Sequence, residues 1–245
     1  MFQGVIPRRF FNRALLGAVP IAATFGARAV VGQDQPPVVV RKSPIDAMSE
    51  FLNGLHFYAD DMGRQVEANH FCTHLTEDFH QCVIYGSSEP DAKLIGIEYI
   101  VSERVFKTLP SDEKRLWHSH RYEVKSGQLI APGIPEAAEH AVMTDLVATY
   151  GKTWHCWQID RDPAFPFGIP QLMMGFTEDG QANPQMVRDR DHRFNVSSSK
   201  LRADRTDILM PTVQSGANSW QGGHTVQLKL EEVAVRNLRS LAGKL

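Results

Sequence analysis

The feature that most constrains the fold is an apolar run, Leu94–Val101, in which Glu98 is the only charged residue. Its Ile, Val and Tyr residues favour a β-strand, and apolar side chains at both odd and even positions indicate a strand covered on both faces. A carboxylate in such a place must be paired, bound to a metal ion or protonated. The run therefore predicts a central strand whose single charge needs a partner.

Hydrophobic periodicity along the rest of the chain predicts a sheet with helices around it. Ser43 and Pro44 give a helix start, and apolar residues every three or four positions extend that helix to about Glu67. The mixed-charge run Arg188–Arg193 is most simply a solvated surface. The fold class we predict is α+β: a single domain with a mostly antiparallel sheet of about five strands flanked by helices, after an N-terminal export signal. We further expect strands at 79–85, 122–130, 153–159 and 171–176, and helices at 111–117, 135–150 and from 230 onward.

The first 29 residues have the pattern of an export signal. Arg8 and Arg9 precede a weakly apolar run, Ala27–Ala29 gives a small-x-small cleavage site, and no acidic residue occurs before Asp34. The adjacent arginines favour a twin-arginine signal, with a Sec signal or a mitochondrial transit peptide as alternatives. We therefore expect a periplasmic or secreted protein. The predicted organisation is a signal peptide at 1–29, a proline-containing linker at 30–42 and the folded domain at 43–245.

Composition limits the partners of the mature chain. The 245 residues, 42% hydrophobic and 22% charged, suffice for one sizeable core. No stretch after the signal approaches the roughly 20 apolar residues that span a bilayer, so we expect a soluble protein without a transmembrane segment. Removing the four signal arginines takes the formal charge from −2 to −6. A mildly acidic chain without a basic stripe argues against nucleic acid as a partner.

The cysteines do not form a disulfide scaffold, because there are only three: Cys72, Cys82 and Cys156. In an oxidising compartment Cys72 and Cys82 could form a disulfide. Two buried free thiols fit the sequence equally well, since free cysteine is commonly a small core residue. Both interpretations stay open at this point.

The strongest chemical motif is the segment Leu116–Gly127, which contains His118, His120 and Glu123. Two imidazoles and a carboxylate are ligands that borderline divalent cations prefer. In a strand the two histidines share a face, and Glu123 joins them only through a bulge or a turn. In a helix His120 and Glu123 align at i, i+3, and His118 does not. We predict a metal site here, with Glu123 as an oxygen ligand or as a catalytic base.

Further ligands must come from elsewhere in the chain. The segment His70–His74 carries two histidines and a cysteine that share a face if extended, and His155 lies in another predicted strand. Neither segment has the spacing of a Rieske centre, a zinc ribbon or a c-type haem. P-loop, dinucleotide-binding and serine-hydrolase motifs are also missing from the sequence. The predicted metal ligands are thus His118, His120, Glu123, His155 and His74, with Glu98 as an alternative and a divalent transition metal of open identity as the cofactor.

Seven segments give the chain a resemblance to the oil body-associated protein family, also described as DUF1264. The resemblance extends over about residues 44–220 and implies a single shared domain. Plant members are associated with seed oil bodies, and the resemblance implies no established catalytic activity. An export signal is a departure from that pattern. The segments are His70–Leu75, Glu98–Glu103, Phe106–Pro110, Leu116–Gly127, Gly151–Thr153, Trp157–Arg161 and Pro170–Met174.

Two functional hypotheses follow. The first is an exported metal-binding protein, whose status as an enzyme and whose small-molecule substrate the sequence leaves open. The second is a non-catalytic protein associated with a lipid surface or the cell envelope. It rests on the resemblance and predicts an exposed apolar face, for which Phe165–Ile169 and the predicted closing helix are candidates.

Overall fold

The computed structural model describes residues 43–236. The predicted export signal and linker lie outside this range, as does the end of the predicted closing helix. Residues 230–236, which that prediction also includes, are not helical. Among the described residues, no helix combines the length and the apolar character needed to cross a membrane.

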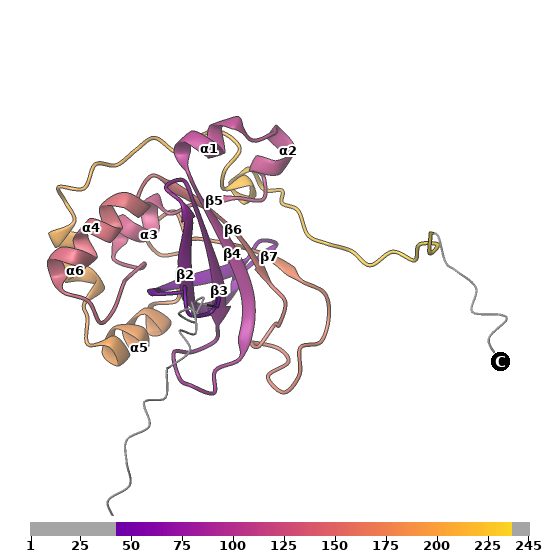
Figure 1. Ribbon diagram of the computed structural model, residues 1–245, viewed down its shortest axis with the longest axis horizontal. Coiled ribbons are helices and arrows are strands. Elements are labelled where there is room, and N and C mark those ends of the chain that lie inside the picture. The colour runs from indigo at the N-terminus through magenta and orange to yellow at the C-terminus, as the bar shows by residue number, and fades with distance from the viewer. Residues whose placement is uncertain (1–42, 237–245) are drawn as a thin grey trace, which may run out of the picture. The chain divides into compact units, whose positions relative to one another are not determined.

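The fold is built on seven antiparallel strands, six of which close a barrel (Figure 1). Strand neighbours follow the order β4-β3-β2-β1-β7-β6, and β6 pairs in turn with β4 from Ser102↔Thr149 to Gly96↔His155. The short β5 adds to β6 through His118↔Gly151. The strands are β1 (Glu50–Tyr58), β2 (Asp61–Thr76), β3 (Phe79–Tyr85), β4 (Leu94–Ser102), β5 (His118–Ser119), β6 (Thr149–His155) and β7 (Gln171–Met174).

One face of every strand points into the barrel, as the register shows. Directly paired residues of antiparallel strands share a face, so the pairs Leu52↔His70, Cys72↔Cys82 and Glu98↔Thr153 all belong to the same inward row. Cys72 and Cys82 form a disulfide across β2 and β3. This pairing decides the question that the sequence left open.

The predicted helix from Ser43 to about Glu67 is wrong, because this stretch forms the β1–β2 hairpin. Every residue from Leu52 to Tyr58 is buried, since one face of β1 lines the barrel and the other is covered. In such a strand apolar residues occupy positions of both parities, so some of them match the helical spacing by coincidence.

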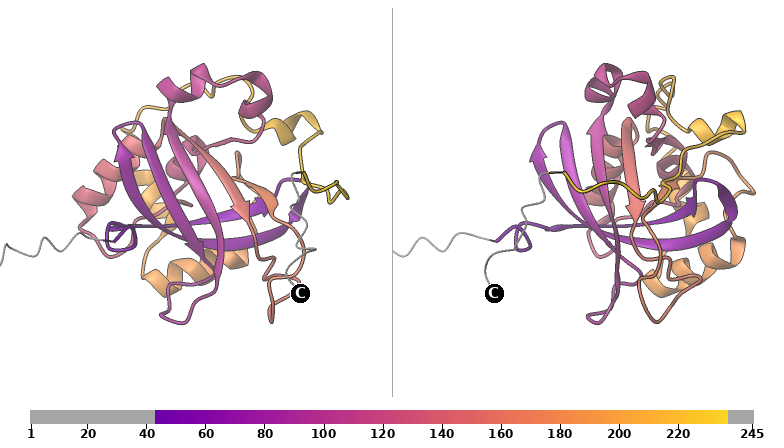
Figure 2. Two further views of the ribbon diagram at one scale, coloured as in Figure 1. Left: turned by 45° about the vertical axis from the view of Figure 1, so that its right-hand side comes forward. Right: turned by 90° about the vertical axis from the view of Figure 1, so that its right-hand side faces the viewer.

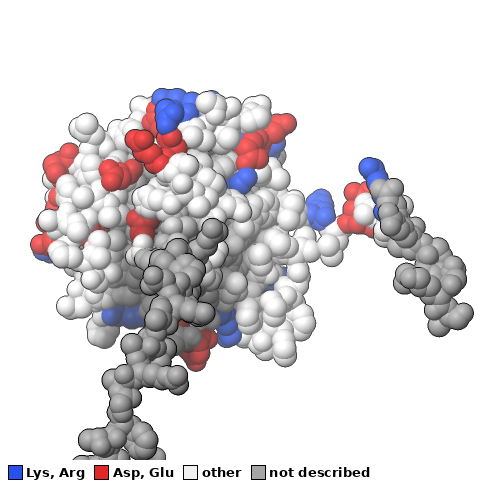
Figure 3. All heavy atoms as spheres, in the orientation of Figure 1, with Lys and Arg blue, Asp and Glu red and all other residues white. Residues whose placement is uncertain are grey.

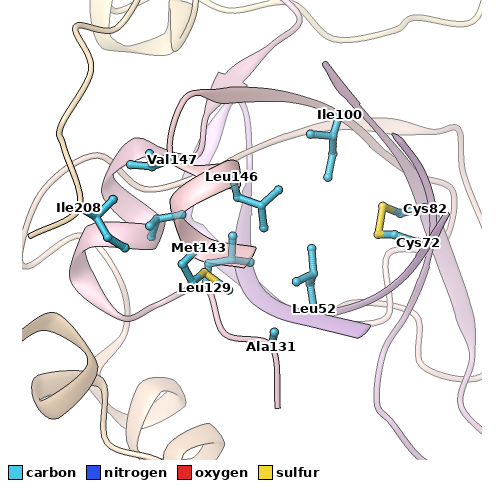
Figure 4. Close-up of a cluster of buried hydrophobic side chains, with 11 residues drawn as sticks. Leu52, Cys72, Cys82, Ile100, Leu129, Ala131, Met143, Leu146, Val147 and Ile208 are labelled. Atoms are coloured by element: carbon cyan, nitrogen blue, oxygen red, sulfur yellow. A yellow bond between two sulfur atoms is a disulfide. The ribbon is translucent and has the colours of Figure 1, made fainter. Parts of the chain in front are cut away.

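Helices cover the outside of the barrel and one of its ends. Figure 2 shows α1 and α2 above the barrel and α5 below it. Met143 and Leu146 of α4 point towards Leu52, Ile100 and the disulfide inside the barrel (Figure 4), so α4 contributes to the core at this end. The helices are α1 (Glu103–Thr108), α2 (Ser111–Lys114), α3 (Arg121–Ser126), α4 (Glu136–Leu146), α5 (Pro184–Phe194), α6 (Ser198–Asp204) and the 3₁₀ helix η1 (Ser219–Gly222).

The predicted fold class is confirmed as a single α+β domain with an antiparallel sheet, but the sheet has more strands than expected and closes on itself. The predicted strand at 122–130 is wrong, because its first part lies in α3, which is followed by Gly127 in the left-handed conformation (φ 77°) that glycine favours. The predicted solvated run Arg188–Arg193 lies in α5, where Arg190 is fully buried. The strands at 79–85 and 94–101 are confirmed as β3 and β4.

Candidate metal centre in the barrel

Five imidazoles and two carboxylates come together inside the barrel, and none is more than 4% exposed. Buried polar groups need hydrogen-bond partners or a bound ion, because an unpaired group loses its hydration without compensation. These seven come from elements spread over a hundred residues. They are His56 on β1, His70 on β2, Glu98 on β4, His118 on β5, His120 before α3, Glu123 in α3 and His155 on β6.

Glu98 is the centre of this group. Its Oε2 lies 2.9 Å from Nε2 of His70 and 3.6 Å from Nε2 of His56. Its Oε1 lies 3.1 Å from Nε2 of His120 and 3.8 Å from Nε2 of His118. The expectation that this carboxylate needs a partner is therefore met by four imidazole nitrogens, two nearest each of its oxygens.

A change from strand to helix brings His118, His120 and Glu123 together. His118 points inward from β5, the chain turns at His120 (φ −76°, ψ −3°), and α3 begins at Arg121. Glu123 then lies in the first turn of the helix, and its carboxylate points back towards His118, with Oε2 3.9 Å from Nε2 of that histidine. Neither a continuous strand nor a continuous helix brings all three residues to one point.

Two glycines provide the space that these side chains occupy. A Cβ atom on Gly151 of β6 would lie 2.8 Å from Nε2 of His120, 2.9 Å from Cε1 of His118 and closer still to Oε1 of Glu98. A Cβ atom on Gly175, just after β7, would lie 2.5 Å from Oε2 of Glu123. A side chain at either position is therefore incompatible with the site as it stands.

Burial sets the charge states of the group. It lowers the pKa of His118 and of His155 to about 3, and that of His56 well below its ordinary value. Burial would raise the pKa of Glu98, but contacts with His120 and His70 outweigh it and hold the pKa well below the usual range. Burial raises the pKa of Glu123 well above its ordinary value. Neutral imidazoles beside an ionised carboxylate are the forms in which these groups bind metals.

The proton on His120 can be placed from its neighbour Thr149. The single hydroxyl proton of Thr149 is donated to the carbonyl of Leu146 (2.7 Å), so its oxygen accepts from Nδ1 of His120 (2.8 Å). In the neutral ring the Nε2 lone pair then points at Oε1 of Glu98. Two acceptors this close need a metal ion or a proton between them. A ligand imidazole held through its other nitrogen is the usual arrangement around protein-bound metals.

Several polar atoms of the group have no hydrogen-bond partner within residues 43–236, among them both ring nitrogens of His118 and Oε2 of Glu123. A cavity of about 10 Å³, the size that holds one water molecule, adjoins the group. It is lined by both carboxylates and three of the histidines, but not by His118 or His155, and otherwise mostly by apolar residues. The site therefore fits a single small ion or water rather than an organic molecule.

Four of the five predicted metal ligands, His118, His120, Glu123 and His155, lie in this group. His74 does not. It has the inward parity expected from alternation, but it lies near the end of β2 with a 57% exposed side chain, 3.3 Å from Glu50 and stacked on His80.

His56 fell within the helix predicted from Ser43 to about Glu67 and was not named as a ligand, and His70 was not selected as a ligand. For His70 the usable signal was that it lies two residues before Cys72, so that both side chains are on one face of a strand. For His56 the usable signal was that Leu52, Gly54 and His56 are alternate residues, which share one face if the segment is a strand. The predicted helix concealed this.

Comparison with known proteins adds to this geometry. The sequence model of the family described as "Protein of unknown function (DUF1264)" matches residues 42–209. The chain is 43% identical over 199 residues to oil body-associated protein 1B of Arabidopsis thaliana, covering 81% of this chain and 83% of that protein. It is 50% identical over 169 residues to oil body-associated protein 1A of Zea mays, covering 69% and 71% respectively. No solved structure matches the chain.

Proposed function

Since this chain belongs to the DUF1264 family of oil body-associated proteins, as its sequence motifs predicted, we propose that it is a metal-binding member of that family. One divalent transition-metal ion would be held inside the barrel by His118, His120, Glu123 and Glu98. The observation that carries the proposal is the pair of unpartnered atoms, Nε2 of His118 and Oε2 of Glu123, which face each other at 3.9 Å among the described residues.

Bond lengths support this choice of ligands. Metal–nitrogen and metal–oxygen bonds of about 2.0–2.2 Å put two ligands of one ion roughly 3 to 4 Å apart. The ligand atoms of His118 lie 3.8 Å from Glu98 and 3.9 Å from Glu123, and His120 lies 3.1 Å from Glu98. Two nitrogens and two oxygens suit zinc, iron or manganese. The metal would supply charge to hold the carboxylates ionised.

The cavity of about 10 Å³ favours a resident ion over catalysis on an organic substrate. Glu123 is accordingly proposed as a ligand, and its role as a catalytic base stays a prediction. Export to the periplasm also stays a prediction, because it depends on residues 1–29, which lie outside the described part of the chain.

Elemental analysis tests the proposal. The protein purified without a polyhistidine tag should contain close to one equivalent or more of a transition metal, because a buried four-ligand site loses its ion slowly. His118→Gln, which removes a fully buried ligand, should lower the metal content at least tenfold.

The matched control for this experiment is His140→Gln. His140 lies on α4, pairs with Asp207 at 3.0 Å and keeps a 34% exposed side chain, so this variant should retain the metal. Less than about 0.1 equivalent in the wild type, unchanged in His118→Gln, would contradict the proposal.

A second candidate function is association with a lipid surface. The curated relatives are named for oil bodies, and the loop between β6 and β7 exposes Phe165 and Phe167 by 62% and 60%, with ring centres 5.9 Å apart. Few charged side chains cover the face over this loop in Figure 3. Adjacent exposed aromatics of this kind are suited to insertion at a lipid boundary.

Flotation with triolein droplets coated with phosphatidylcholine tests this second function. The wild type should rise with the droplets. Phe165→Ser/Phe167→Ser should lower the bound fraction about tenfold or more, because full burial of one phenylalanine side chain contributes about 1.5–3 kcal/mol. Leu209→Ser, which replaces an 85% exposed leucine elsewhere, is the control. A wild type that stays in the aqueous fraction would exclude the lipid role under these conditions.

A further inference from the structure

A second group of potential ligands lies where the ends of β1, β2 and β3 come together. Glu50 begins β1, His74 lies near the end of β2 and His80 lies near the start of β3. His74 pairs directly with His80 across the two strands, and Glu50 pairs with Cys72, two residues before His74. Directly paired residues share a face, as do residues two apart, so the three side chains project from the same inward row as the disulfide.

The ligand atoms of these three side chains converge. Oε2 of Glu50 lies 3.3 Å from Nε2 of His74 and 3.9 Å from Nδ1 of His80. The two rings stack with centres 3.7 Å apart, and the three ligand atoms all lie within 4.8 Å of one another. Because ligands of one ion stand roughly 3 to 4 Å apart, the group has the spacing of a shared metal ion.

Hydrogen bonds do not account for this arrangement. Oε2 of Glu50 and Nδ1 of His80 are buried atoms without a hydrogen-bond partner within residues 43–236. His74 lies close to the carboxylate, but the two groups are not aligned for a hydrogen bond. A buried polar atom without a partner destabilises a fold by about 1–3 kcal/mol, whereas one ion between the two atoms would satisfy both.

Charge pairing with His80 does not account for the arrangement either. Burial, with smaller contributions from His74 and His120, lowers the pKa of His80 to about 4. The ring is therefore neutral at pH 7 and forms no ion pair with Glu50. A neutral imidazole is also the form that binds a metal ion without first losing a proton.

We propose that Glu50, His74 and His80 form a second metal site, which takes one divalent transition-metal ion. Two imidazoles and one carboxylate are ligands that zinc and copper ions accept. The site does not rest on the proposed function, because none of its ligands belongs to the seven buried residues inside the barrel.

The second site is open to solvent, unlike the first. The side chain of His74 is 57% exposed, while those of Glu50 and His80 are 18% and 12% exposed. Three protein ligands leave the fourth position of a tetrahedral ion to water, as in open zinc sites. The disulfide between Cys72 and Cys82 is the next pair on the same face, and it ties together the two strands that carry the histidines. The ion would therefore exchange with the solution at a site whose frame is rigid.

Titration of the metal-free, untagged full chain with Cu²⁺ tests the second site, because Cu²⁺ binds a given set of nitrogen and oxygen ligands most tightly among divalent first-row ions. The starting protein is His118→Gln, which disables the proposed interior site. It should bind one equivalent, with nitrogen couplings from two imidazoles in its electron paramagnetic resonance spectrum. Adding His74→Gln should weaken binding at least tenfold in competition with a chelator, since loss of a partner that merely orients a ligand already costs about 10–100-fold.

The matched control is His140→Gln in the same background. His140 also lies beside a carboxylate, that of Asp207 at 3.0 Å, but no third ligand joins this pair among the described residues. This variant should bind Cu²⁺ as tightly as the starting protein. Equal affinities of the His74→Gln and His140→Gln proteins, or no binding by the starting protein, would overturn the second site.

These results are separate from those that test the proposed function. Metal that is present in the wild type and lost in His118→Gln reports on the interior ion, whereas the effect of His74→Gln reports on the second site alone. His74→Gln alters a side chain that is mostly exposed, so it should not prevent folding. If His118→Gln does not fold, the same comparison of His74→Gln with His140→Gln in the wild-type background decides the question.

Discussion

Replacing Arg190 with leucine should lower the free energy of unfolding by about 3–5 kcal/mol, the loss expected when one member of a buried charged network is removed. Arg190 is fully buried in α5 and donates to the carbonyl of Gln128 (2.6 Å), the carbonyl of Gly127 (3.2 Å) and Oδ1 of Asn53 (3.2 Å). These acceptors would lose their donor without gaining water. Urea unfolding followed by circular dichroism measures the change.

The same substitution should disturb the candidate metal centre. Gly127 terminates α3, which carries Glu123, and Asn53 lies on β1, which carries His56. The guanidinium of Arg190 therefore ties two elements of the centre to one helix. We expect the variant that folds to hold its metal more weakly, and dialysis against a chelator would measure this.

The control for this prediction lies two residues earlier on the same helix. Arg188 is exposed, and its guanidinium contacts Gln185 of the same helix. Arg188→Leu should therefore change the free energy of unfolding by less than about 0.5 kcal/mol, as is usual for surface substitutions. Equal effects of the two substitutions would show that the contacts of Arg190 do not stabilise the fold.

Arg190 also shows where charge patterning misleads. The run Arg188–Arg193 alternates basic and acidic residues, and its composition is that of a solvated helix face. Nothing local marks one arginine as buried, because the acceptors that hold it inside the fold, on Asn53, Gly127 and Gln128, lie more than sixty residues away in sequence. Such a contact is decided by tertiary packing, which composition does not report.

Strand prediction succeeded for the two runs that turn residues separate and failed for β1. The runs that became β3 and β4 are separated by a Gly-Ser-Pro-rich turn and were recognisable. In β1 the burial of both faces removed the alternation on which the distinction from a helix depends. Closure of the barrel, through pairing of β4 with β6, has no local signal at all.

The candidate site was predictable in its chemistry but not in its membership. His118, His120 and Glu123 were recognisable as potential ligands from residue type and spacing. That they converge depends on the change from β5 to α3 at His120. The strand interpretation required a bulge or a turn to bring Glu123 to the histidines, but it did not predict the helix that follows. His56 was missed because β1 was predicted as a helix. Only in a strand do Leu52, Gly54 and His56 point to the same side.

Replacing Gly151 with alanine should both destabilise the fold, by about 3 kcal/mol, and empty the proposed metal site. The added Cβ would lie 2.8 Å from Nε2 of His120 and 2.9 Å from Cε1 of His118, and closer still to Glu98. All three are buried, so they would have to move against packed neighbours, which typically destabilises a core by about 1–3 kcal/mol. Their movement would also separate the proposed ligands, so elemental analysis should find the metal content reduced at least tenfold.

Gly222→Ala is the matched control, because it makes the same change where nothing lies within 4 Å of the added methyl group. It should leave the metal content unchanged and alter the free energy of unfolding by less than about 0.5 kcal/mol. A Gly151→Ala protein that is as stable as this control and keeps its metal would show that the ion lies away from β6. A protein that folds but lacks the metal would localise the ion beside Gly151, because loss of the whole fold would then not explain the result.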